Sequence, residues 1–247
     1  MNKRTLTVSA ALPALLCLSF SLLCAPAGQA EENALVLKQW SFLNGATQLT
    51  LSKKGVRFEV PGRHLAMIMA PPVWNVQFLN LQRKVYYECT PAAWRPQMSS
   101  ATVFFRPGDP GALVPASSAE STIQGLKCRR YLLKLPASQN SSGTHTWEQL
   151  LVKTAELYAI DDNNYPKVVK TILAKNFGTY RDAGIPLVLT CTNNRNEISK
   201  ELRLSSHSTT PFKAGDFLVP KDFKRVKTGP EVTSNQSDNE GFSEFIR

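Results

Sequence analysis

The sequence predicts a mainly β protein of the α+β class, in which a helix covers an antiparallel sheet. Two patterns predict this architecture. Apolar and polar residues alternate with a period of two along most of the chain after residue 33, as they do in strands that bury one face. The segment 161–178 instead carries its apolar residues at helical spacing. A helix between strands of a meander buries its apolar face against the sheet.

The first thirty residues predict a secretory signal peptide. The basic start MNKR precedes a mostly apolar stretch at 8–23, and Gly28 and Ala30 match the small residues that signal peptidase requires. We expect cleavage after Ala30, and Ala25 and Ala27 offer a second cut. The mature protein is therefore expected to be periplasmic or secreted. No later stretch is long and apolar enough to span a bilayer, so no transmembrane segment is expected after cleavage.

The expected organisation is a signal peptide at 1–30, one domain at 31–226 and a disordered tail at 227–247. The tail is polar and weakly patterned. Loss of Lys3 and Arg4 with the signal lowers the formal net charge from +10 to +8. The basic residues are scattered among strands, so we expect a solvated surface, no nucleic-acid partner and a monomer.

The period-two pattern defines the expected strands. They are 34–42, 47–51, 55–60, 64–70, 73–79, 84–89, 102–106, 125–135, 150–160, 185–192 and 197–206. Short links rich in Gly, Pro, Asn and charged residues predict hairpins between neighbours. The segments 107–124 and 136–146 are rich in Pro, Gly and Ser, which predicts long surface loops.

The segment DDNNYPKVVKTILAKNFG predicts one amphipathic helix. Its aspartates and asparagines can cap the first turn, Pro166 suits a first turn, and Gly178 ends the pattern. The apolar face is formed by Val168, Val169, Ile172, Leu173 and Phe177. We expect this face to lie on the sheet.

Three cysteines remain after signal cleavage: Cys89, Cys128 and Cys191. In an oxidising compartment they allow one disulfide and one free thiol, with three ways to choose the pair. We expect a disulfide between Cys89 and Cys128, which lie on candidate strands that an antiparallel sheet can place opposite each other. The alternative is that all three are small buried hydrophobic residues.

The sequence contains no motif for catalysis or metal binding. His64, His145 and His207 lie far apart and lack partners at metal-ligand spacing, and Asp161 and Asp162 suit helix capping. Phosphate-binding loops, GxSxG, HExxH and calcium-binding loops are absent. We therefore expect no enzyme activity, no catalytic or metal site and no cofactor.

The order of the segments resembles the exported bacterial families of unknown function related to the LolA/LolB-like lipoprotein-carrier superfamily. The resemblance covers most of residues 34–226 and is carried by GLKCRRYLL, by ELY before a Pro-bearing helix, by GIPLVLT and by the closing FLVPKDF. It implies a strongly curved antiparallel sheet, an incomplete barrel, with helices over its concave face. A hydrophobic cavity lies between sheet and helices in such a fold.

The segment VRFEVPGRHLAMIMAPPVWNVQFL, residues 56–79, concentrates apolar residues that could wall such a cavity. The candidate ligand-binding residues are Phe58, Met67, Trp74, Val76, Phe78 and Tyr87 from the strands, with Ile172, Leu173 and Phe177 from the helix. A pocket of this kind predicts a non-enzymatic protein that binds a lipid or other hydrophobic molecule. The alternative is a structural or envelope-interaction module with a filled core, whose basic stretches at 127–134 and 221–227 face an anionic envelope surface.

Overall fold

A computed structural model describes residues 32–42, 44–95, 113–134, 152–161, 165–177, 179–180 and 182–234. All of these residues belong to one compact unit of the chain, 32–247. The expected signal peptide, the strand at 102–106 and the loop at 136–146 lie outside the described residues.

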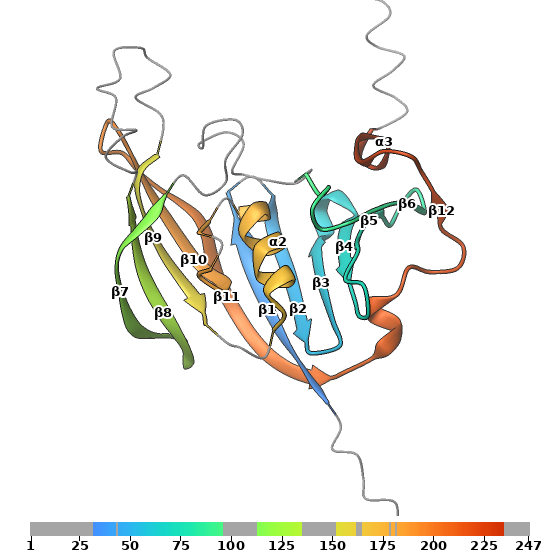
Figure 1. Ribbon diagram of the computed structural model, residues 1–247, viewed down its shortest axis with the longest axis horizontal. Coiled ribbons are helices and arrows are strands. Elements are labelled where there is room, and N and C mark those ends of the chain that lie inside the picture. Colours follow the sequence, from blue (N-terminus) through green and yellow to red (C-terminus); the bar gives the residue numbers. More distant parts are fainter. Residues whose placement is uncertain are drawn as a thin grey trace, which may run out of the picture. The chain divides into compact units, whose positions relative to one another are not determined.

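Among the described residues, twelve strands form one open, mainly antiparallel sheet (Figure 1). The strands are, in chain order, β1 (Asn33–Ser41), β2 (Gly45–Ser52), β3 (Gly55–Val60), β4 (Leu65–Met69), β5 (Val76–Asn80), β6 (Val85–Cys89), β7 (Val114–Ile123), β8 (Leu126–Lys134), β9 (Val152–Ile160), β10 (Ile185–Asn193), β11 (Ile198–Pro211) and β12 (Lys224–Arg225). Their order across the sheet is β12-β6-β5-β4-β3-β2-β1-β11-β10-β9-β8-β7. The meanders β1–β6 and β7–β11 are therefore joined side by side through the pair β1 and β11.

The described helical elements are few and short. They are η1 (Pro61–Arg63), α2 (Lys167–Phe177), η4 (Ala214–Phe217) and α3 (Gly229–Thr233). Helix α2 occupies most of the segment whose apolar spacing predicts a helix. The class predicted from the sequence, mainly β with an antiparallel sheet, is confirmed, and β3 has the bounds that the alternation indicates.

The segment 107–124 is not all surface loop as expected, because Val114–Ile123 forms β7. This strand pairs with β8 through a two-residue link, Gln124 and Gly125, which both have positive φ. Such a pair matches the right-handed twist of a hairpin. Strand β7 is one of the two edges of the described sheet and is almost fully exposed, so its sequence carries no apolar alternation.

The beginning of the expected disordered tail is ordered. Helix α3 buries Val232 completely, and the Asn80 side-chain amide donates a hydrogen bond of 3.0 Å to the Val232 carbonyl. Arg83 donates to the Glu231 carbonyl at 2.9 Å. These contacts hold residues 229–234 against β5 and the β5–β6 turn, so only 235–247 of the expected tail lies outside the described residues.

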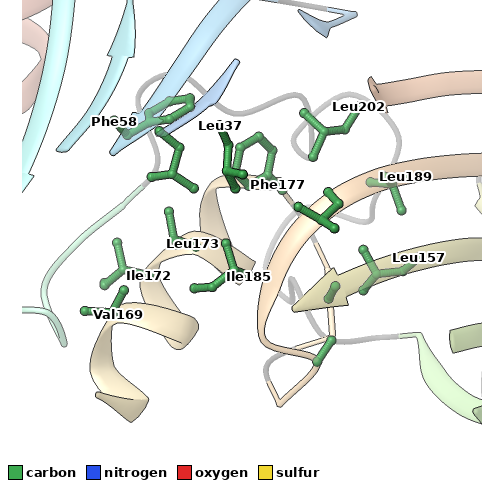
Figure 2. Close-up of a cluster of buried hydrophobic side chains, with 14 of the residues drawn as sticks. Leu37, Phe58, Leu157, Val169, Ile172, Leu173, Phe177, Ile185, Leu189 and Leu202 are labelled. Atoms are coloured by element: carbon green, nitrogen blue, oxygen red, sulfur yellow. The ribbon is translucent and has the colours of Figure 1, made fainter. Parts of the chain in front are cut away.

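The core combines strand residues with the apolar side of α2 (Figure 2). Val169, Ile172, Leu173 and Phe177 are buried on the helix. The Phe177 ring meets the Phe58 ring edge to face, with centroids 5.5 Å apart. A cluster that continues through the strands at the centre of the sheet therefore includes the helix.

Candidate functional site

The nine candidate ligand-binding residues lie in one apolar cluster. Seven of them are at most 3% exposed, and Trp74 and Tyr87 are partly buried. Their side chains pack on each other and on neighbours, as the Phe58–Phe177 contact and the Phe78–Trp94 contact at 5.7 Å show. The sequence thus identified residues that the fold brings together, and in this structure they form a packed core.

Two polar side chains join the end of α2 to β4 and to the turn that follows β6. The buried Asn176 amide accepts a hydrogen bond of 2.9 Å from Trp94 Nε1 and donates one of 3.3 Å to Met67 Sδ. Lys175 donates to the Pro91 carbonyl at 3.2 Å. The end of α2 is therefore held by directional bonds as well as by apolar contact, and no strand pairing attaches it.

A pocket of about 480 Å³ lies elsewhere, on the hairpin of β7 and β8. It is lined by Glu120, Ser121, Thr122, Lys127, Cys128, Arg129 and Asp161. None of the nine candidate residues lines it. An ion pair of 3.5 Å joins Arg129 to Asp161 at its wall, so this is a polar pocket with charges of both signs.

The expected Cys89–Cys128 disulfide is absent, because all three described cysteines are free. Cys89 ends β6, whose sheet neighbours are β5 and β12, whereas Cys128 lies on β8 between β7 and β9. The two strands belong to different meanders and are not paired. Cys128 and Cys191 are buried in the core cluster, and Cys89 packs against it. The alternative assignment, small buried hydrophobic residues, therefore describes Cys128 and Cys191, whereas Cys89 is only partly buried.

The core face contains a polar region that the sequence did not reveal. Gln39 and Ser41 of β1 and Glu201 of β11 are 2%, 0% and 3% exposed; we call these three residues the acceptor cluster. Ser41 is the register partner of Leu202, and Gln39 pairs with Leu204. Both leucines belong to the core, so the two β1 side chains face it too. Trp40, between them, meets exposed Arg203 on the opposite face, 4.7 Å from its ring centroid.

A β-bulge turns Glu201 toward the core. Leu189 of β10 pairs with Leu202, but the next residue, Thr190, pairs with Lys200, so Glu201 is an extra residue on β11. A bulge of this kind places two consecutive side chains on one side of the sheet. Glu201 and Leu202 are accordingly both buried, whereas strict alternation would expose the glutamate. The sequence ISKELRLS does not indicate the bulge, so Glu201 could not be predicted to face the core.

The acceptor cluster lacks hydrogen-bond donors within the described part of the chain. Gln39 Nε2 donates to the Pro186 carbonyl at 2.8 Å, which leaves Gln39 Oε1 without a partner. Ser41 Oγ and both carboxyl oxygens of Glu201 are also unpaired. Each buried polar group in this state costs about 1–3 kcal/mol of folding free energy. Native proteins rarely retain such groups without a reason.

Burial determines the protonation of this region. It raises the pKa of the Glu201 carboxyl, an effect that the nearby Ser199 hydroxyl opposes without reaching hydrogen-bond geometry. Burial, reinforced by the charge of Glu201, raises the pKa of the Cys191 thiol to about 12. The cysteine is therefore a neutral core residue and a poor nucleophile.

The two basic stretches are partly neutralised by acidic neighbours. In the stretch at 127–134, Arg129 pairs with Asp161, and Arg130 forms a short ion pair with Glu156. In the stretch at 221–227, Arg225 lies 3.4 Å from Glu88. These contacts reduce the charge that either stretch presents to an anionic surface.

Groups that could hold a metal ion do not converge in the described residues. No three His, Cys, Asp or Glu side chains there are placed to hold a metal ion. His207 is exposed and bonds the Gln124 carbonyl at 2.9 Å. His64 is an exposed turn residue, and His145 lies outside the described ranges. None of the helices in these ranges is both long and apolar enough to cross a membrane.

No protein-family model matches the chain, and no curated protein gives a significant match. Solved structures do match. An uncharacterised conserved protein from Thermus thermophilus is 10% identical, with a TM-score of 0.34, over 81% of this chain and 92% of that chain. A MucA/MucB complex structure from Pseudomonas aeruginosa is 12% identical, with a TM-score of 0.34, over 80% of this chain and 59% of that chain.

A third match is a proposed outer membrane lipoprotein-sorting protein domain from Vibrio parahaemolyticus. It is 9% identical, with a TM-score of 0.29, over 76% of this chain and 90% of that chain. At these identities and TM-scores the similarity assigns no function to the chain.

Proposed function

We propose that this chain is an exported, non-enzymatic protein that binds a lipid or other hydrophobic molecule between its sheet and α2. The observation that carries the proposal is the apolar cluster that contains all nine candidate residues. Eight of them come from β3 to β6 and α2, and Trp74 lies in the β4–β5 link rather than on the strand that the sequence predicts. The amino-terminal sequence pattern supports export to the periplasm or beyond.

Because the cluster is packed, a ligand must displace α2 to enter. The end of α2 is held by side-chain hydrogen bonds of Asn176 to Trp94 and Met67 rather than by strand pairing. Moving it would expose apolar strand residues such as Phe58 and Phe78, on which an alkyl chain gains about 0.8 kcal/mol per buried methylene. Local opening of weakly attached elements is a common route for ligand entry. Under this proposal, α2 covers these strand residues until a ligand displaces it.

The test is binding of a fluorescent fatty-acid probe to the chain beginning at residue 31. We expect Trp74→Glu to weaken probe binding at least about tenfold, because a charge at the partly buried Trp74 position opposes an apolar ligand. The matched control is Val73→Glu, since Val73 is 67% exposed and adjacent in sequence. The control should bind like the wild type. Circular dichroism and size-exclusion chromatography establish that both variants remain folded.

A second candidate function is a structural or envelope-interaction module that uses the sheet as a scaffold. The full packing of the nine residues favours it, because a scaffold needs no cavity. This candidate predicts that no probe binds the wild type and that Trp74→Glu unfolds the protein while Val73→Glu does not. That pair of results would refute the ligand-binding proposal.

A further inference from the structure

Gln39, Ser41 and Glu201 present four buried oxygen atoms that lack a donor within the described residues. The orientation of Gln39 is determined by its neighbour, because only the amide nitrogen can bond the Pro186 carbonyl. Its oxygen is therefore available to another group. All four atoms are buried acceptors, and the Glu201 carboxyl is the only group among them that can carry a charge.

The acceptor cluster adjoins the apolar cluster on the same face of the sheet. Ser41 is the register partner of Leu202, and Glu201 precedes that leucine on the bulge. Figure 2 shows Leu202 and Leu189 in the cluster that also contains Phe58 and Phe177. A molecule lying along the apolar cluster could therefore place one end at the acceptors. This arrangement suits an amphiphile with a head and a tail.

The chemistry of the acceptors selects the head. A carboxylate, an amide oxygen and a hydroxyl oxygen can together accept several hydrogen bonds, which an ammonium group with three N–H donors can supply. The positive charge of the ammonium also compensates the buried carboxylate. A carboxylate or phosphate head would instead meet Glu201 as a like charge. An uncharged hydroxyl head offers one donor and no compensating charge.

We propose that Gln39, Ser41 and Glu201 bind the ammonium head of an amphiphile whose alkyl chain lies against the apolar core face. This inference rests on the hydrophobic-ligand function proposed above and narrows its ligand to an amine-bearing class.

The experiment compares dodecylammonium, dodecanol and dodecanoate as displacers of a neutral fluorescent alkyl probe, each below its micelle concentration. The wild type should bind dodecylammonium about tenfold to a hundredfold more tightly than dodecanol, the range expected for hydrogen bonds to a charged group. Glu201→Gln should remove this preference, because it weakens dodecylammonium binding far more than dodecanol binding. Glu197→Gln is the matched control, because Glu197 is an exposed glutamate in the β10–β11 turn.

Each outcome decides a different point. Equal binding of the three compounds by the wild type would overturn the head-group assignment and leave the hydrophobic-ligand function intact. An amine preference that survives Glu201→Gln would also overturn it. Failure of the wild type to bind any of the three, or the probe, would overturn both. Should Glu201→Gln fail to fold, the preference of the wild type and the effect of Ser41→Ala, expected to weaken amine binding more than dodecanol binding, still decide the assignment.

Discussion

The region around Phe58 and the region around Glu201 are buried to a similar extent, yet they are built differently. Phe58 is 1% exposed and meets the Phe177 ring, within strands that keep a regular register. Glu201 is 3% exposed, lies on a bulge and leaves both carboxyl oxygens unpaired. Burial alone therefore does not identify a stabilising residue. The first region stabilises the fold, and the second reduces its stability.

The largest expected effect is that of Phe58→Ala. Removing a buried aromatic ring from a packed core costs about 3–5 kcal/mol of unfolding free energy, since apolar contact is lost and a cavity remains. Urea denaturation followed by circular dichroism measures the change. Ile198→Ala is the control, because Ile198 is 71% exposed, and it should change stability by less than about 0.5 kcal/mol.

Ser41→Ala tests a polar position that is as deeply buried as Phe58. Ser41 is fully buried like Phe58, but its hydroxyl has no partner in the described chain, so its removal should be neutral or slightly stabilising. A loss as large as that of Phe58→Ala would mean that the hydroxyl is bonded in solution and that the acceptor cluster is wrongly described.

Sequence reasoning succeeded in the first region and failed in the second for a physical reason. The alternation around Phe58 and the helical spacing through Phe177 are local patterns, and the fold preserves both. Glu201 points inward because it is the extra residue of a β-bulge where β11 pairs with β10, and no local sequence pattern encodes that bulge. Strand β7 was not predicted because it lies almost fully exposed at an edge of the sheet and therefore shows no alternation of apolar and polar residues. The disulfide prediction failed because sheet order, which places β6 and β8 apart, is a long-range property.

A pH series tests the polar region. Because burial raises the pKa of Glu201 in the folded protein above its unfolded value of about 4.3, the folded state binds the proton more tightly. The stability contributed by this proton is present at acid pH and is lost as pH rises through the folded pKa. Glu201→Gln cannot lose it, so the variant should become increasingly more stable than the wild type as pH rises. Cys191 is the titratable neighbour that the charge of Glu201 reaches.

Thermal unfolding at several pH values provides the measurement for this series. Glu197→Gln is again the control, and it should follow the wild-type curve, since Glu197 is exposed and its carboxylate accepts a hydrogen bond from Asn193 at 2.7 Å. If Glu201→Gln and the wild type kept a constant difference from acid to neutral pH, the pKa of Glu201 would be the same in the folded and unfolded states. Its carboxyl would then be solvated or paired, and the description of an unpaired buried carboxyl would be wrong.

The smallest expected effect is that of a reductant. With Cys89, Cys128 and Cys191 free, no disulfide contributes to stability, so dithiothreitol should leave the thermal midpoint of the chain from residue 31 unchanged. In the native protein, half-buried Cys89 should react first with a thiol reagent and Cys191 last, because Cys191 is 1% exposed and its pKa is about 12. Three thiols should react after denaturation without reductant. One thiol under those conditions, together with a midpoint that falls on reduction, would require a disulfide and would contradict the three free thiols of this structure.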